Sequence, residues 1–315
     1  MAGERTLDGR SGPGRAPLSR WRHLHAEGGQ WSRGRYVVFI VPTLVVMLAV
    51  IVFPWLFTVF MSVHNWKIGQ AHGFVGPDNY LALLADERFL RSLLRTLYYG
   101  VLAVVVPVIL GTFSAIIFHK RFALRGLLRG VFILPMMATP VAVALVWTMM
   151  FHPQLGVLNY LLSLPGLPPQ SWVYAPETVI PTLVMVEVWQ WTPLVMLIVL
   201  GGLAALPTEP YESARIDGAS EWQMFRHITW PLLLPFIMVA AIIRAIDAIK
   251  AFDLIFVISQ GGPGTASETI NIYLYLEAFA FYNIGYASAI VVVFFFLIVA
   301  LTLLLLYMRQ KTQWM

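Results

Sequence analysis

Six apolar stretches, each long enough to cross a lipid bilayer, constrain this chain more than any other feature. A helix rises about 1.5 Å per residue, so roughly 20 apolar residues cover the hydrocarbon core of a membrane. In water, stretches of this kind would leave large apolar patches exposed. They predict an all-α membrane protein with six transmembrane helices, over Tyr36–Val63, Thr96–Phe118, Val131–Phe151, Val179–Ala205, Trp230–Ile246 and Ile284–Tyr307.

The composition agrees with a membrane location and excludes several other classes of protein. Of the 315 residues, 59% are hydrophobic and only 12% are charged, whereas soluble domains average about 25% charged residues. An ordinary soluble enzyme, a disordered chain and a fibrous repeat are therefore excluded. The chain has no cysteine, which excludes a disulfide framework, a thiolate zinc site, an iron–sulfur cluster and a cysteine nucleophile.

Positive charge is distributed unevenly among the segments that flank the stretches. Fifteen Lys and Arg residues fall on the side that holds both termini and five on the other side, with Arg244 inside a stretch. Because cytoplasmic segments carry the excess of Lys and Arg, we expect both termini in the cytoplasm. Residues 1–35 are expected to form a flexible basic tail that orients the protein and binds no nucleic acid, and residues 36–311 to form the transmembrane domain.

The chain lacks the motifs that covalent or metal chemistry would need. Its seven histidines lie in tails, in loops or at the edges of stretches, and it contains no His-Glu-x-x-His run. A phosphate-binding loop needs Gly-Lys followed by Ser or Thr, but none of the four lysines follows a glycine. We therefore expect no enzyme activity, no bound metal or cofactor and no ATP hydrolysis by this chain. The glycine-rich run from Gly261 to Gly264 is interpreted as a turn.

The connection between the fourth and fifth stretches, residues 206–229, has the pattern of two short helices joined by a glycine. Thr208 is expected to cap the first helix, and Gly218 to end it in the left-handed conformation. Ser220 and Gln223 have the spacing of a capping box at the start of the second helix. Such a bent helix pair, with exposed acids and small apolar residues, suits insertion into a groove on a cytoplasmic partner.

The residues of this loop resemble the EAA loop of binding-protein-dependent ABC importer permeases. The similarity rests on Glu212-Ser213-Ala214, on Gly218 and, after nine further residues, on Ile228-Thr229-Trp230-Pro231. The resemblance implies the type I ABC importer permease fold, in which this loop forms a coupling helix that docks into the ATP-hydrolysing subunit. The residues that it assigns to ATPase coupling are Glu212, Ser213, Ala214, Asp217, Gly218 and Ala219.

Other segments are similar to one branch of that family, the sugar and glycerol-3-phosphate permeases. They include Phe74–Tyr80 before the second stretch, Pro135 and Pro140 in the third, and Gly261-Gly262-Pro263 before the sixth. The resemblance implies alternating-access import of a carbohydrate-class solute (a sugar, oligosaccharide, polyol or glycerol-3-phosphate) across a bacterial or archaeal cytoplasmic membrane. It implies as partners a second homologous permease, two copies of a cytoplasmic ATP-binding subunit that use ATP and Mg²⁺, and an external, periplasmic solute-binding protein.

Charged side chains inside the stretches mark a candidate substrate pathway, because a charge is costly to bury in a bilayer. Glu187 lies beside Gln190 and Trp191, and carboxylate, amide and indole groups together suit the hydroxyls and C–H faces of a sugar. The alternative is that Glu187 pairs with Arg244 or with a residue of a second permease. Charged residues recur every three or four positions at Arg244, Asp247, Lys250 and Asp253, so we predict that they share one face of a helix. That face is either held together by salt bridges, part of the pathway lining or a contact for the binding protein.

Two other functions fit parts of the sequence. The same machinery could carry a non-carbohydrate solute, such as a peptide or an oxyanion, but the sugar-branch segments argue against it. A self-sufficient channel or secondary carrier is the other alternative. It would need no coupling loop, and a secondary carrier usually shows an internal repeat, of which this sequence has no sign.

Overall fold

The computed structural model describes residues 33–70 and 72–312, so that most of the predicted basic tail lies outside the described residues. The chain divides into two compact units, residues 1–56 and 57–315. In the first unit, α2 (Arg33–Met47) continues through a π-helical turn, η1 (Leu48–Val52), into α3 (Phe53–Ser62), whose later residues belong to the second unit. Apolar side chains in the first unit are exposed, as Val50 is at 67%, which agrees with a membrane span over Ile40–Ser62.

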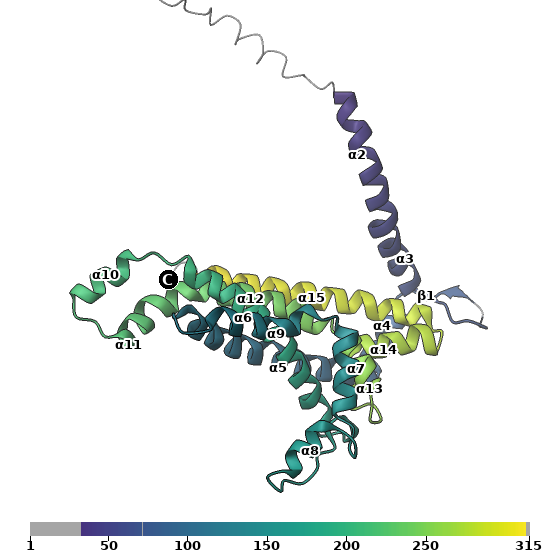
Figure 1. The fold of residues 1–315 in the computed structure, drawn as a ribbon. Helices are drawn as coiled ribbons and strands as arrows, with labels where there is room; N and C mark the ends of the chain where they lie inside the picture. The colour runs from purple at the N-terminus through teal and green to yellow at the C-terminus, as the bar shows by residue number, and fades with distance from the viewer. Residues whose placement is uncertain (1–32, 71, 313–315) are drawn as a thin grey trace, which may run out of the picture. The chain divides into compact units, whose positions relative to one another are not determined.

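Long helices form the body of the second unit (Figure 1). The most buried of the long apolar helices is α9 (Val179–Ala204), which packs against α5 (Glu87–His119), α6 (Arg125–Met137) and α12 (Trp230–Ile249). The last helix, α15 (Ile284–Thr312), packs against α12. Glycine permits the close approach of α5 to α9, because a Cβ atom on Gly111 would lie 2.6 Å from the Cβ atom of Val195.

The membrane-spanning helices confirm an all-α membrane protein, with one change of geometry. Among the described residues, five helices are long and apolar enough to cross a membrane, and α6 with α7 (Pro140–Met150) makes a sixth span if the bent pair counts as one. The stretch predicted as a single span over Val131–Phe151 is broken, because these two helices meet at 97°. Pro140 has no backbone N–H and favours an extended conformation in Thr139, whose ψ is 143°, so the helix stops and restarts.

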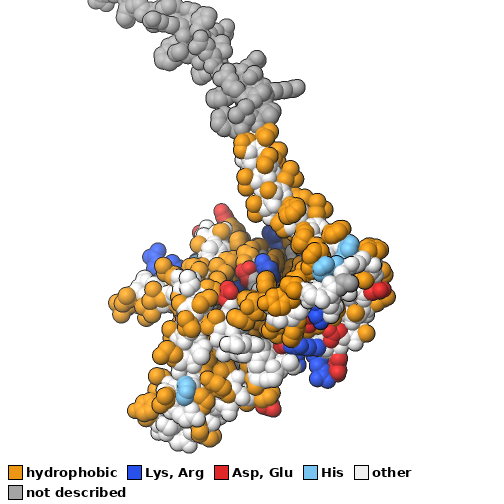
Figure 2. All heavy atoms as spheres, turned by 90° about the vertical axis from the view of Figure 1, so that its right-hand side faces the viewer, with side chains coloured by type: hydrophobic (Ala, Val, Ile, Leu, Met, Phe, Trp, Pro, Cys, Tyr) orange, Lys and Arg blue, Asp and Glu red, His pale blue; other side chains and the backbone are white. Residues whose placement is uncertain are grey.

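Hydrophobic side chains cover most of the face that Figure 2 presents, and acidic and basic side chains occur there in small groups. The C-terminal end of α15 lies at the same end of the bundle as α10 (Glu209–Ile216) and α11 (Glu221–Met224) (Figure 1). This placement agrees with the expectation that the C-terminus and the loop over residues 206–229 share one side of the membrane. We refer to this end as the predicted cytoplasmic end and to the opposite end as the predicted outer end.

Short elements complete the second unit. A π-helical turn, η3 (Phe225–Thr229), joins α11 to α12, and α8 (Val157–Ser163) and the 3₁₀ helix η2 (Trp172–Tyr174) lie between α7 and α9. The remaining short elements are the antiparallel strands β1 (His64–Asn65) and β2 (Gly73–Phe74), which the sequence did not predict, the helices α4 (Asp78–Ala85), α13 (Asp253–Ser259) and α14 (Ile270–Tyr275), and the π-helical turn η4 (Leu276–Ala280).

At the predicted outer end, Asp86 joins three helices. Its Oδ1 accepts hydrogen bonds from the backbone N–H groups of Arg88 and Phe89 at the start of α5, at 2.8 and 3.3 Å. Its Oδ2 accepts hydrogen bonds from the hydroxyls of Tyr273 in α14 and Tyr286 in α15, at 2.5 and 2.6 Å. Burial alone would raise the pKa of Asp86, but these four hydrogen bonds to the carboxylate together hold it below its ordinary value of 3.8.

Candidate functional site

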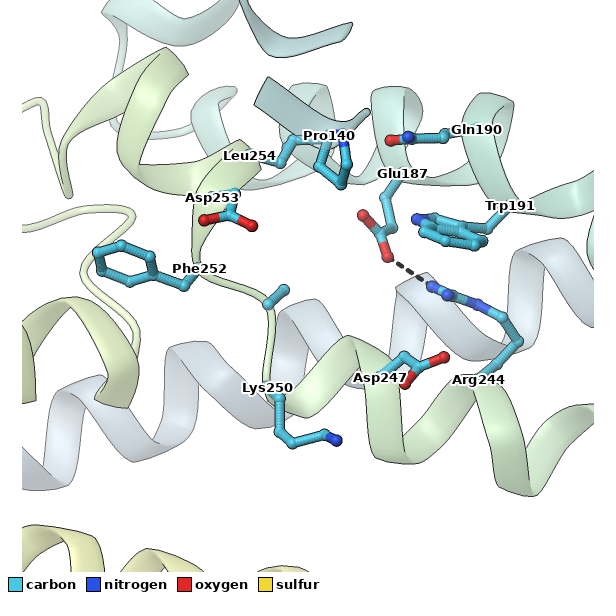
Figure 3. A pocket seen from close by; sticks show the side chains of 11 residues that line it. Pro140, Glu187, Gln190, Trp191, Arg244, Asp247, Lys250, Phe252, Asp253 and Leu254 are labelled. Atoms are coloured by element: carbon cyan, nitrogen blue, oxygen red, sulfur yellow. Dashed lines mark hydrogen bonds and ion pairs between the residues drawn. The ribbon is translucent and has the colours of Figure 1, made fainter. Parts of the chain in front are cut away.

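A pocket of about 360 Å³ opens beside the bend between α6 and α7. The first turn of α7, the middle of α9, the last turns of α12 and the segment leading into α13 surround it (Figure 3). All six residues that the sequence placed on a substrate pathway line this one pocket. Its lining consists of Pro140, Glu187, Gln190, Trp191, Arg244, Asp247, Lys250, Ala251, Phe252, Asp253 and Leu254.

The floor of the pocket holds a buried ion pair. Nη2 of Arg244 lies 2.5 Å from Oε1 of Glu187, and the two side chains are 0% and 6% exposed (Figure 3). The guanidinium also lies over the ring of Trp191, 5.1 Å from its centroid. Because either charge alone would be costly to bury, the pair explains how both are accommodated between α9 and α12. Of the alternatives for Glu187, the pairing with Arg244 is therefore present, and it leaves Glu187 on the pocket wall.

Three hydrogen-bonding atoms at this floor lack a partner among the described residues: Oε1 of Gln190 and the Nε and Nη1 atoms of Arg244. Gln190 is fully buried, and its Nε2 donates a hydrogen bond to the carbonyl oxygen of Ala138 at the bend, at 3.1 Å. Buried polar groups without partners are rare in folded proteins. The three atoms are also buried, so they lie beneath the surface of the pocket.

The mouth of the pocket is formed by Asp247, Lys250 and Asp253. These side chains are exposed, and within residues 33–70 and 72–312 no ion pair involves any of them. The prediction that they share a single helix face is wrong for Asp253, because α12 ends at Ile249 and Asp253 begins α13. In the same part of the chain, no group of three or more His, Asp or Glu side chains is arranged to hold a metal ion.

Sequence reasoning missed two features that shape this pocket. The bend before Pro140 places the first turn of α7 against the pocket, and the only local signal for it is the proline itself. The segment between α12 and α13 is held by Nδ2 of Asn271, which donates hydrogen bonds to the carbonyl oxygens of Ile249 and Ala251 at 3.0 and 3.3 Å. These partners are 22 and 20 residues away, so no short pattern marks Asn271.

The loop between α9 and α12 has the predicted helix–glycine–helix form. Gly218 ends the first helix with φ of +74°, a conformation that L-residues other than glycine rarely adopt. The capping box is confirmed, because Ser220 and Gln223 each bond to the other's backbone N–H. Thr208 occupies the predicted N-cap position of α10, but its side chain makes no capping hydrogen bond. The six residues assigned to ATPase coupling lie together on α10 and the turn after it, exposed or half-buried.

Apolar side chains are unusually exposed around this turn. Ile216, the last residue of α10, is 87% exposed, and Trp222 in α11 is 66% exposed. The Trp222 ring stacks on Phe225 with the centroids 5.6 Å apart. Exposed apolar groups of this size on a predicted cytoplasmic loop indicate a surface that a partner covers.

The loop over residues 206–229, called the coupling loop below after the role that the resemblance implies, is connected to the pocket through α12. Tyr211 of α10 and Thr229 at the end of η3 form a hydrogen bond between their hydroxyls, at 2.9 Å. The chain then enters α12, which carries Arg244 on the pocket floor.

Comparison with known proteins places these features in one family. Residues 107–313 match the family described as the binding-protein-dependent transport system inner membrane component, and this range contains both the pocket and the coupling loop. A probable ABC transporter permease protein, y4oQ of Sinorhizobium fredii, is 35% identical over 257 residues, 81% of this chain and 83% of that protein. The trehalose/maltose transport system permease protein MalF of Thermococcus litoralis is 36% identical over 249 residues, 79% of this chain and 83% of that protein.

The fold is also that of a solved importer. A chain of a bacterial ABC transporter involved in the import of the acidic polysaccharide alginate superposes with a TM-score of 0.78 at 22% identity, over 93% of this chain and 99% of that one. The family match and the fold together confirm the resemblance seen in the coupling loop. This chain therefore belongs to the binding-protein-dependent transport system inner membrane components, the permease subunits of ABC importers.

Proposed function

We propose that this permease carries a carbohydrate-class solute and that the solute passes through the pocket between α9 and α12. The observation that carries the proposal is the pocket floor, where an unpartnered amide oxygen of Gln190 lies beside the Trp191 indole and the Glu187–Arg244 pair. Sugar hydroxyls both donate and accept hydrogen bonds, which suits a pocket lined by carboxylate, amide and guanidinium groups. The 36% identity to a trehalose/maltose permease supports the same solute class.

The size of the pocket suits a small sugar. Its volume of about 360 Å³ falls at the lower end of the range typical of small-molecule sites, about 300–1,000 Å³. An oligosaccharide would extend through the mouth toward the surface contributed by a second permease. A peptide or an oxyanion has less support, because the charges of Glu187 and Arg244 cancel on the pocket floor.

The coupling loop is proposed to dock into the ATP-hydrolysing subunit through Glu212, Ser213, Ala214, Asp217, Gly218 and Ala219. The exposed apolar groups beside these residues, Ile216 and Trp222, supply the area that such a contact would bury. Movement of the loop would pass through the Tyr211–Thr229 hydrogen bond into α12 and so to Arg244 and the pocket. Alternating access would follow from that displacement.

The proposed assembly contains a second homologous permease, two cytoplasmic ATP-binding subunits and an external solute-binding protein, in a bacterial or archaeal cytoplasmic membrane. This chain has no Gly-Lys sequence, so ATP and Mg²⁺ would be used by the ATP-binding subunits. Membership of a transport-system family argues against the alternative of a self-sufficient channel or secondary carrier.

Affinity purification of the tagged chain from its native membrane tests this assembly. We expect an ATP-binding subunit and a second permease to co-purify, and the complex to hydrolyse ATP faster when its binding protein and a sugar are added. A chain that purifies alone would contradict the proposal. A complex that responds to an amino acid or an oxyanion, but to no sugar or polyol, would contradict the solute class.

A further inference from the structure

The floor and the mouth of the pocket differ in charge. On the floor, Glu187 and Arg244 form a buried ion pair, so their formal charges cancel. At the mouth, Asp247 and Asp253 carry two formal negative charges and Lys250 one positive charge, all on exposed side chains. The five ionisable residues of the lining therefore leave one net negative charge, located where a solute enters.

The orientation of the mouth residues increases this asymmetry. Figure 3 shows the carboxylate of Asp253 directed into the space that faces Glu187 and Pro140, whereas the side chain of Lys250 extends away from that space. Neither Asp247 nor Asp253 has a salt-bridge partner among the described residues. The charge that a solute meets first is therefore negative.

The floor does not distinguish neutral from anionic sugars. Oε1 of Gln190 and the Nε and Nη1 atoms of Arg244 are unpartnered but buried. Hydroxyl donors are present in neutral sugars, sugar phosphates and uronates alike. Discrimination between these solutes therefore depends on the charges of the mouth.

We propose that the mouth residues Asp247 and Asp253 repel anionic solutes, so that this permease passes neutral sugars and polyols and excludes sugar phosphates and uronates. This inference rests on the proposed function, which it narrows by removing glycerol-3-phosphate and acidic oligosaccharides from the solute class. At about 6 Å in a partly aqueous site, the one net negative charge of the mouth lowers the local concentration of a monoanion by about threefold and raises that of a monocation by about threefold.

The absence of cysteine from the chain gives a direct test of the local potential. Ala251 lines the pocket between the two acids and is half-buried, so Ala251→Cys places a single thiol there. In the complete importer, the thiol is reacted with a cationic methanethiosulfonate, which carries trimethylammonium, and with an anionic one, which carries sulfonate. Intact-mass spectrometry of this chain gives both rates and is unaffected by cysteines in other subunits.

A matched control is available on the predicted outer end. Ser163→Cys lies on the exposed side of α8, in a connection over residues 152–178 whose only Asp, Glu, Lys or Arg is Glu177. We expect the cationic-to-anionic rate ratio to be about tenfold higher at Ala251→Cys than at Ser163→Cys. Adding Asp247→Asn and Asp253→Asn leaves Lys250 as the charged residue of the mouth and should bring the ratio to the control value or below it, whereas adding Lys250→Gln alone should raise the ratio further.

Three outcomes would overturn the inference: equal ratios at the two positions, a ratio that the two Asn substitutions leave unchanged, or a thiol at Ala251→Cys that neither reagent reaches. The charge test uses no transport activity. If ATP-driven uptake of a neutral disaccharide is found while the ratios are equal, the charge filter fails and the proposed function stands. If the ratio is high and no carbohydrate is transported, the proposed function fails.

Discussion

At the scale of single residues, the buried pair of Glu187 and Arg244 dominates the pocket. Two charges inside a membrane protein are stable only when each satisfies the other, and here one guanidinium nitrogen and one carboxylate oxygen are 2.5 Å apart. Arg244 also lies over the Trp191 ring, and these three side chains line the pocket together with Gln190. The Glu187–Arg244 pair therefore stabilises the folded protein and also lines the candidate site.

The first prediction concerns this pair. Glu187→Gln leaves the charge of Arg244 buried without a counter-ion, so we expect the free energy of unfolding to fall by about 3–5 kcal/mol. Thermal unfolding of the purified importer in detergent measures the loss. Asp247→Asn is the matched control, since Asp247 is exposed and unpaired, and it should change stability by no more than about 0.5 kcal/mol.

A second substitution distinguishes lost pairing from lost packing. Adding Arg244→Met to Glu187→Gln removes the isolated charge, so part of the lost stability should return. If Glu187→Gln unfolds at the same temperature as the unchanged protein, the pair is not a stabilising contact. If Glu187→Gln changes the uptake kinetics while the protein is expressed at its full level, the Glu187 side chain also contacts the solute.

At the scale of elements, Gly218 tests the proposed coupling loop. Gly218→Val forces a β-branched residue to φ of +74°, at a cost of about 1–3 kcal/mol, so the turn between α10 and α11 should change shape. Because Gly218 lies outside the candidate membrane spans, we expect normal membrane insertion, continued ATP hydrolysis and loss of uptake. The ratio of ATP hydrolysed to solute imported measures this uncoupling.

Gly166→Val is the matched control for that prediction. Gly166 has φ of +80° and open space around its Cα atom, as Gly218 does, but it lies in the connection between α7 and α9. The backbone strain is therefore similar, and only the place in the fold differs. Normal coupling in Gly218→Val, or equal uncoupling in the two variants, would contradict the assignment of the loop.

Asp86 links three elements and gives a prediction for pH. Its folded-state pKa is held below the ordinary value of 3.8 by four hydrogen bonds, so its stabilisation is complete above that value and is lost as the pH falls through the lowered pKa. The unfolding temperature of Asp86→Asn should lie below that of the unchanged protein at pH 6, and the gap should narrow toward pH 3. A gap that stays constant with pH would contradict the role of the ionised carboxylate.

The elements also show what the sequence could predict and what it could not. The apolar stretches and the capping box predicted their helices because both depend on neighbouring residues. The bend at Pro140 was not predicted, since Pro107 and Pro135 lie inside helices that continue, and only the packing around each proline decides the outcome. The prediction of one shared helix face was wrong for Asp253, because the spacing of the charged residues does not show that α12 ends at Ile249.

Six residues of the pocket lining could be named from the sequence as a candidate substrate pathway, but the form of the pocket could not be predicted. Glu187 and Arg244 could be paired in advance because both are charges inside apolar stretches. Contacts such as those of Asn271 with Ile249, or of Asp86 with Tyr273, join residues that no local pattern relates, and only the folded chain brings them together.

At the scale of the whole molecule, the chain is a permease whose pocket and coupling loop lie on helices that meet at α12. It is one part of an importer, and the proposed account requires the ATP-binding subunits to drive movement at the loop and the pocket to respond. That requirement separates an importer subunit from a protein that transports by itself.

Uptake of a radiolabelled neutral disaccharide into proteoliposomes tests this account most directly. The vesicles hold either the complete importer with its binding protein or the two permeases without the ATP-binding subunits. The account predicts ATP-dependent accumulation in the first preparation and none in the second. Accumulation without the ATP-binding subunits would contradict it, because the chain would then be a channel or carrier that needs no coupling loop.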